Sequence, residues 1–338
     1  MGEKLNMKTA LITSTGSVAT DISLKSLKRM GFRVIGCNIY PKEWIVESCE
    51  MDEFYQIPPV SDNENYLDAI KNICIEQKVD MLLPMIDYEI DLLNVNREWF
   101  EQHEVVLCMS PKEALDIIRN KKCLADFVEK ECPKTKSIPT LVLKDVHELE
   151  WDFPVVCKPY NGRSSQGLRY IYSKEEWEEF YSTADKNLYI VEPFIEGPLV
   201  MVEAVRQIEP HKVIAMTRRE LIATPHGCST TVYLYQDKEL EEATKILADK
   251  LNVWGDVNFE YILDKNGIYH LVECNPRFSA GCEFSCMGGY DYIENHIKCF
   301  MGKEIEDAHF KHNMVIARKY EEYITATDIE VAYTNTYH

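Results

Sequence analysis

The sequence lacks several features that would assign it to other classes of protein. No apolar run approaches the roughly 18 residues of a membrane span, and the first residues, MGEKLNMKTALIT, lack the apolar core and small-residue cleavage site of a secretory signal. Positive charge is also scarce, because 37 Lys and Arg against 56 Asp and Glu leave a net charge of −19. We therefore expect a cytoplasmic protein that binds neither membranes nor nucleic acid through general charge, and that binds small anions only where basic residues gather.

The 12 cysteines form no pattern typical of disulfides or metal binding. The sequence contains no CxxC pair, and Cys282 and Cys286, which could share a helix face, have no further ligands nearby in the sequence. Cys37, Cys108 and Cys157 lie inside apolar runs, where a free cysteine behaves as a small apolar residue in a reducing compartment. We therefore expect free cysteines and no structural metal.

A dinucleotide-binding fingerprint is missing from the first strand and helix. Residues 8–13 predict a buried strand, residues 22–30 an amphipathic helix and residues 33–38 a second strand, which is a Rossmann-like beginning. The loop at residues 14–17, STGS, has one glycine instead of GxGxxG, and no ribose-binding carboxylate follows the second strand. We interpret this loop as a structural turn or as a contact to some other ligand.

The remaining length allows two or three domains. At 338 residues and 46% hydrophobic content, the chain can bury substantial cores. Strands predicted at 79–84 and 105–109 continue the first domain, which closes near residue 112. Asp87 and Glu89 follow the first of these strands, where α/β sheets bind ligands. We favour helix capping for both, with a ligand contact as the alternative.

A lysine interrupts an apolar strand in the middle of the chain. The strand at residues 153–159, FPVVCKP, contains Lys158, and a lysine in such a place needs an anion. The loop at 161–167, NGRSSQG, offers donors for phosphate oxygens, and a strand follows at 168–172. A P-loop would place a helix there, so the sequence predicts a phosphate-covering hairpin.

Several other stretches have two interpretations. A predicted helix at 113–130 carries Lys121, which by itself is an exposed helix residue. The strand at 188–191 ends at Glu192 and continues either as a turn or as a linker between lobes that contacts a flat base. Strands at 200–205, 213–216 and 231–235 predict a second, antiparallel sheet. Arg218, Arg219 and His226 fall between these strands and either contact a substrate or balance carboxylates.

The clearest local signal is a hairpin near the carboxyl end. Residues 256–263 and 268–273 predict two strands joined by a turn that ends in Asn266-Gly267. This hairpin brings Glu260 across from Glu273, while Asn275 and Arg277 follow Glu273 at two-residue spacing on the same side. The sequence therefore predicts carboxylate and amide oxygens for Mg²⁺, next to a guanidinium for phosphate.

The order of these elements resembles the ATP-grasp superfamily and, within it, short relatives of the carbamoyl phosphate synthase large subunit. The resemblance covers nearly the whole chain and implies an α/β and α+β fold, with a Rossmann-like pre-ATP-grasp domain followed by a two-lobed ATP-grasp domain. The implied parts are residues 1–112 for the first domain, 113–193 for the N-terminal lobe, 194–320 for the C-terminal lobe and 321–338 for a tail.

The resemblance also implies the roles of site residues. Arg277 and Lys158 would be catalytic. ATP would be bound by Lys121, Lys158, Gly162, Ser164, Ser165, Gly167, Glu192, Phe194 and Ile195. Mg²⁺, for which Mn²⁺ can substitute, would be bound by Glu260, Glu273 and Asn275, and the substrate by Arg218, Arg219 and His226. Two departures are Pro198-Leu199, where the family often has a ribose-binding acid that Glu196 or Glu203 would replace, and Asn120, where an aspartate is common.

The activity implied is that of an ATP-dependent carboxylate–amine ligase. Phosphoryl transfer would activate a small-molecule carboxylate as an acyl phosphate, and an amine would then displace phosphate. The absence of an internal repeat argues against a complete carbamoyl phosphate synthase. The alternatives are a kinase-like enzyme that stops at a phosphorylated carboxylate or carbamate, and a non-catalytic nucleotide-binding module. The family also implies a homodimer.

Overall fold

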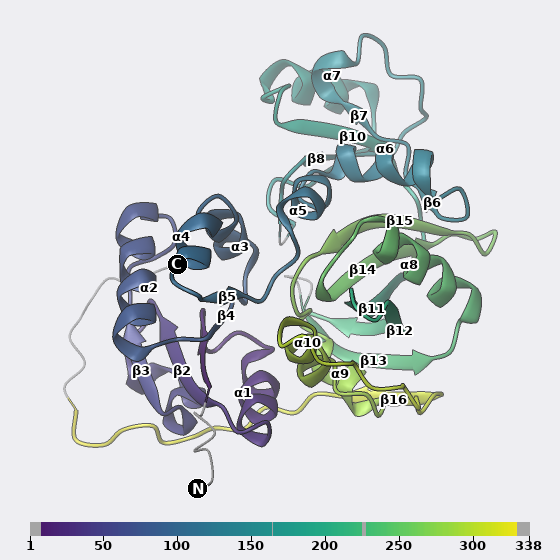
Figure 1. Ribbon diagram of the computed structural model, residues 1–338. Helices are drawn as coiled ribbons and strands as arrows, with labels where there is room; N and C mark the ends of the chain where they lie inside the picture. Colours follow the sequence, from purple (N-terminus) through teal and green to yellow (C-terminus); the bar gives the residue numbers. More distant parts are fainter. Residues whose placement is uncertain (1–7, 164, 225–227, 330–338) are drawn as a thin grey trace, which may run out of the picture.

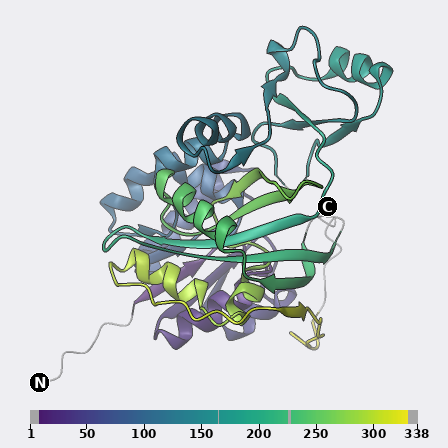
Figure 2. The same cartoon turned by 90° about the vertical axis from the view of Figure 1, so that its right-hand side faces the viewer.

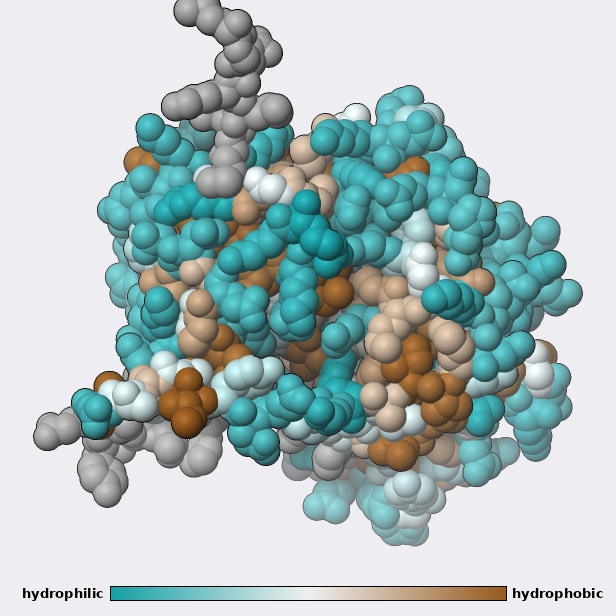
Figure 3. All heavy atoms as spheres, turned by 90° about the horizontal axis from the view of Figure 1, so that it is seen from below, coloured by the Kyte–Doolittle hydropathy of each residue, from teal (hydrophilic) through white to brown (hydrophobic). Residues whose placement is uncertain are grey.

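The computed structural model describes residues 8–163, 165–224 and 228–329 and contains three sheets in sequence order (Figure 1). This arrangement confirms the predicted fold class. Among the described residues, no helix combines the length and the apolar character needed to cross a bilayer. The face seen from below is mainly hydrophilic, with apolar side chains gathered in patches (Figure 3).

The first sheet is parallel, with strand order β3-β2-β1-β4-β5. Its strands are β1 (Thr9–Ile12), β2 (Arg33–Asn38), β3 (Glu53–Gln56), β4 (Met81–Leu83) and β5 (Val106–Leu107). Its helices are α1 (Thr20–Arg29), α2 (Asn63–Gln77), α3 (Asp87–Asn94) and α4 (Arg97–Gln102). The central strands β1, β2 and β4 are buried over most of their length, as parallel sheets require, whereas the edge strands β3 and β5 are partly exposed.

The second sheet is antiparallel and small, and its order is β7-β10-β8-β9. It contains β7 (Leu141–Val142), β8 (Val155–Pro159), β9 (Arg169–Ile171) and β10 (Tyr189–Pro193), with α7 (Lys174–Thr183) alongside. This lobe projects from the rest of the molecule (Figures 1 and 2). The 161–167 loop joins β8 to β9, as the hairpin prediction requires.

The third sheet has seven strands in the order β16-β13-β12-β11-β14-β15-β6. These are β6 (Lys136–Ser137), β11 (Leu199–Gln207), β12 (Lys212–Ala223), β13 (Ser229–Tyr235), β14 (Gly255–Leu263), β15 (Tyr269–Asn275) and β16 (Met314–Ala317). Its helices are α8 (Lys238–Lys250), α9 (Cys282–Met287) and α10 (Tyr292–Phe300). Although β6 precedes the second sheet in the chain, it pairs in parallel with β15 of the third.

The first and third sheets share a hydrophobic core. Side chains of β1, β2 and α1 pack in one cluster with side chains of β11, β13 and α10. At its edge, Asp291 before α10 accepts hydrogen bonds from Ser26 and Arg29 of α1. This packing holds the first domain against the third sheet, so residues far apart in sequence can form one site.

Two local predictions are wrong. The single helix at 113–130 is two helices, α5 (Lys112–Ile118) and α6 (Lys121–Glu131), because Asn120 is extended and its side chain accepts from the backbone N–H groups of Lys122 and Cys123. Arg218 and Arg219 lie inside β12, not between strands, because that strand continues to Ala223. The 264–267 turn is confirmed, with Gly267 at a φ of 79°.

Candidate active site

Two cavities meet beside the end of β15. The first, of 220 Å³, lies between the second sheet and the β14–β15 hairpin. The second, of 490 Å³, continues toward the first domain and is bounded there by Ser17, Val18 and Ala19 and by the start of α3. Glu260 and Glu273 line both cavities. Ligands in the two cavities would therefore face the same pair of carboxylates.

The first cavity has an apolar slot at one side and lysines at the other. Its apolar lining consists of Ile138, Val156, Leu168, Tyr170, Phe194, Ile195, Ile262 and Val272. The polar lining includes Lys121, Lys158, Gly162 and Ser165. Gly167, at a φ of 73°, closes the 161–167 turn beneath them, where a side chain would clash with Pro159. A flat apolar group followed by anionic groups fits this division.

Lys158 is buried on β8 and has a carboxylate partner. Its Nζ lies 2.7 Å from Glu192 Oε2 on the neighbouring β10, and the Thr140 hydroxyl donates to the other oxygen of Glu192 at 3.1 Å. The sequence assigned Glu192 to the linker around a base. In the structure Glu192, Phe194 and Ile195 all line the first cavity, and the carboxylate of Glu192 also holds Lys158.

Lys121 lies at the first turn of α6 and links the loop to the carboxylates. Its Nζ lies 2.9 Å from Glu273 Oε2 and donates to the carbonyl of Gly162 at 2.8 Å. The break in the helix at Asn120 creates this placement, because it starts a new helix whose first side chain reaches the cavity. The substitution of asparagine for the aspartate common in the family therefore retains the N-cap.

Glu260 and Glu273 are directly paired across β14 and β15, as the hairpin predicted. Burial and the charge of Glu273 raise the pKa of Glu260 to about 8. Burial acts in the same direction on Glu273, but Lys121 outweighs it and lowers the pKa of that carboxyl. The Asn275 amide donates to both carboxylates, at 2.8 Å and 3.4 Å. Two converging carboxylates that repel each other are a donor set suited to a divalent cation.

Asn275 turns its nitrogen, not its oxygen, toward the two carboxylates. Its oxygen accepts from Arg277 Nη2 at 3.4 Å. Ligation of a metal by this oxygen would require the amide to rotate. Arg277 itself extends into the second cavity, where its Nε donates to Asp87 Oδ2 at 3.1 Å.

Asp87 and Glu89 differ in what they contact, although both lie in the first turn of α3. Glu89 accepts from the hydroxyls of Thr13, Ser14 and Tyr66 and from the backbone of Met85, so it holds the strand-end loop of the first domain. Asp87 instead pairs with arginines at the second cavity. The capping interpretation therefore describes Glu89 but misses the role of Asp87. The sequence feature that could have indicated a role for Asp87 at the site was the pair of acids that follows a parallel strand.

The predicted substrate residues that the structure describes, Arg218 and Arg219, have different surroundings. Arg218 is buried, lines the second cavity and donates to Glu203, Asn258, Ser279 and Ser285. Arg219 is exposed and lines neither cavity. His226 lies outside the described residues, as does Ser164 of the predicted phosphate loop. Other residues that line the second cavity with Arg218 include Arg163, Glu220 and Tyr88.

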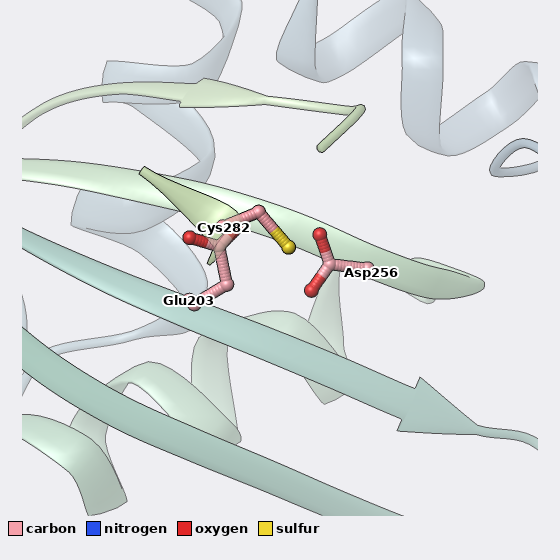
Figure 4. A group of neighbouring side chains, drawn as sticks. All are labelled: Glu203, Asp256 and Cys282. Carbon is pink, nitrogen blue, oxygen red and sulfur yellow. The ribbon is translucent and has the colours of Figure 1, made fainter. Parts of the chain in front are cut away.

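Glu203 of β11, Asp256 of β14 and Cys282 of α9 form a buried group in which the three side chains lie close together (Figure 4). One possible ligand atom from each residue lies within 4.8 Å of the others. Nothing in the sequence indicated that two acids lie beside Cys282, because β11 and β14 meet only through sheet pairing. Arg218 neutralises Glu203, and burial together with Glu203 raises the pKa of Asp256 well above its ordinary value. We therefore interpret the group as a charge-balanced core in which Asp256 is protonated.

Comparison with known proteins identifies the fold of this site. Residues 11–108 match the model of the PylC-like N-terminal domain, and residues 185–322 match the model described as ATP-grasp in the biosynthetic pathway with Ter operon. The two matches support an ATP-grasp fold with a PylC-like domain ahead of it.

One curated relative and two solved structures illustrate the similarity. The carbamoyl phosphate synthase large chain of Clostridium acetobutylicum is 20% identical over 297 residues, covering 83% of this chain and 27% of that protein. The biotin carboxylase domain of Hydrogenobacter thermophilus 2-oxoglutarate carboxylase, bound to MgADP and bicarbonate, has a TM-score of 0.74 at 17% identity over 92% of this chain and 74% of its own. The ADP complex of purK, N5-carboxyaminoimidazole ribonucleotide synthetase, has a TM-score of 0.72 at 16% identity over 92% and 81%. The chain thus spans about a quarter of its carbamoyl phosphate synthase relative, and the solved structures show a shared fold.

Proposed function

We propose that the protein is an ATP- and Mg²⁺-dependent ligase that couples a small-molecule carboxylate to an amine and releases ADP and phosphate. The observation that carries the proposal is the junction of the two cavities at Glu260 and Glu273. ATP would occupy the first cavity with its γ-phosphate at the junction, and the carboxylate would occupy the second. The similarity to ATP-grasp proteins bound to ADP or MgADP supports this assignment.

The residues at the junction would have different roles according to their charge. Lys121, Lys158 and the 161–167 loop would bind the phosphates, and Arg277 would orient and neutralise the moving phosphoryl group. Glu260, Glu273 and a rotated Asn275 would hold Mg²⁺ or Mn²⁺, which supplies positive charge to the phosphate oxygens.

The reaction would proceed in two balanced steps. An oxygen of the substrate carboxylate attacks the γ-phosphorus, the bond to the bridging oxygen breaks, and ADP leaves. The amine nitrogen then attacks the acyl carbon, phosphate leaves with the bonding electrons, and the nitrogen loses a proton. Closure of the 161–167 loop would protect the acyl phosphate from water.

The test is ADP release with ATP and Mg²⁺, measured over a panel of small carboxylic acids with and without amines. We expect release that depends on the acid, and a mass-identified amide when an amine is added. If no amine changes ADP release or yields an amide, the protein is a kinase-like enzyme that stops at the acyl phosphate. If ATP binds without any release, the non-catalytic alternative holds.

The remaining assignments are proposed on the same basis. We divide the chain at residues 112, 193 and 320, with the last segment as a tail, and place it in the cytoplasm as a homodimer. Light scattering that gives a monomer mass would reject the dimer.

A further inference from the structure

Helix α3 of the first domain presents two aspartates to arginines from three other parts of the chain. Asp87 and Asp91 are four residues apart, so they lie on one face of the helix. The arginines are Arg119 after α5, Arg163 in the 161–167 loop and Arg277 after β15. The five side chains form one continuous set of ion pairs.

Asp87 is the buried member of the set. Its side chain is 6% exposed, and its oxygens lie 3.1 Å from Arg277 Nε and 3.3 Å from Arg119 Nη1. Burial opposes ionisation, but Arg277 and Arg119 together keep the pKa of Asp87 below its ordinary value. A fixed carboxylate at this point restricts the orientation of the Arg277 guanidinium.

Asp91 continues the set toward the loop. It accepts from Arg119 Nε at 2.9 Å and from Arg163 Nη2 at 2.5 Å. The Arg163 guanidinium also lies over the ring of Tyr88, 3.9 Å from its centroid. The Tyr88 hydroxyl donates to Gln166 at 3.0 Å. Two residues of the loop are therefore attached to one face of α3.

From these contacts we infer that α3 positions the site: Asp87 orients Arg277, while Asp91 and Tyr88 hold the 161–167 loop over the nucleotide. The inference rests on the proposed function. It makes the first domain part of the nucleotide site although none of these three residues lines the first cavity.

A purely structural role predicts a different result from a positioning role. The side chain of Asp91 is 39% exposed, and ion pairs at that exposure contribute only about 0–1 kcal/mol to folding. Its loss should therefore leave thermal unfolding nearly unchanged. Loss of a positioning contact should instead weaken loop ordering and raise the KM for ATP.

The experiment compares Asp91→Asn, Asp91→Glu and Tyr88→Phe with the matched control Asp116→Asn, which removes an exposed aspartate paired with Lys112. Hydrogen exchange of the 161–168 segment is measured with and without Mg²⁺ and a non-hydrolysable ATP analogue, and the KM for ATP is measured by ADP release. We expect Asp91→Asn to reduce nucleotide-dependent protection and raise this KM roughly 5- to 30-fold, with partial recovery in Asp91→Glu.

The outcomes separate the inference from the proposed function. If the wild type binds the analogue and protects the loop but Asp91→Asn behaves like Asp116→Asn, the positioning role is refuted and the ligase proposal stands. If the wild type neither binds the analogue nor protects the loop, both fail. If Asp87 orients Arg277, Asp87→Asn should lower kcat and leave the KM for ATP constant. An unchanged kcat would refute the role of Asp87 in orienting Arg277.

Discussion

Replacing Glu260 with glutamine should separate activity from stability. Burial and the charge of Glu273 raise the pKa of Glu260 from 4.5 to about 8 in the folded, metal-free protein. An acid with a higher pKa in the folded chain favours folding below its unfolded pKa, and this contribution is lost as pH rises through the folded pKa. The metal-free protein should therefore lose stability between pH 4.5 and 8.

The size of the effect follows from this shift. At pH 7 the upper limit is about 3 kcal/mol, from roughly 1.4 kcal/mol for each pH unit above 4.5. Glu260 is only half-buried, so solvent screening reduces the expected value to about 1–2 kcal/mol. Glu260→Gln removes this cost and should stabilise the metal-free protein by that amount at pH 7.

The same substitution should abolish most of the activity. Removing one charged metal ligand at the junction is expected to lower ADP release by about 10²- to 10³-fold. Urea unfolding at pH 5, 7 and 8.5 in the presence of a chelator measures stability, and ADP release with Mg²⁺ measures activity. Glu242→Gln is the matched control, because Glu242 is exposed and only weakly paired with Lys245 at 3.8 Å.

Two results would refute the reasoning. If Glu260→Gln is less stable than the wild type at pH 7 and 8.5 without metal, the two carboxylates do not repel each other as described. If it retains ADP release within threefold of the wild type, Glu260 does not hold the metal.

Three further predictions concern the buried polar residues. Arg218→Met should cost about 3–5 kcal/mol in urea unfolding because Glu203 loses its cationic partner, whereas the exposed Arg219→Ala should change stability by less than about 0.5 kcal/mol. In urea unfolding, Asp256→Asn should be at least as stable as the wild type, and its advantage should grow above pH 3.8. The reason is that the raised pKa of the acid makes folding less favourable as pH rises. A large loss of stability at pH 7 would instead show that Asp256 is ionised. Asn120→Ala should lower the melting temperature through a loss of about 1 kcal/mol of N-cap stabilisation.

Elements with strong local signals could be predicted from the sequence alone. The alternation of apolar residues and the Asn266-Gly267 turn specified the β14–β15 hairpin, because the turn type sets the register of the strands. The turn register pairs Leu263 with Tyr269 and Tyr261 with Leu271, and a register shift between Tyr261 and Glu260, which the sequence did not indicate, brings Glu260 opposite Glu273. Two-residue spacing placed Asn275 and Arg277 beyond Glu273. The loop after Lys158 could be predicted equally well, because a glycine-rich connection between two apolar strands permits few arrangements.

The distant residues that complete the site could be identified only from the folded chain. The break at Asn120 could not be read from helix periodicity, because apolar spacing continues across it and a single side-chain cap determines the boundary. Arg218 and Arg219 are adjacent in sequence, yet strand alternation buries the first and exposes the second once β12 extends through both. Asp87 and Asp91 meet their arginines only because the shared core holds the first domain against the third sheet. Long-range packing therefore brings these charged residues to their partners, and the local sequence does not indicate which partners they will have.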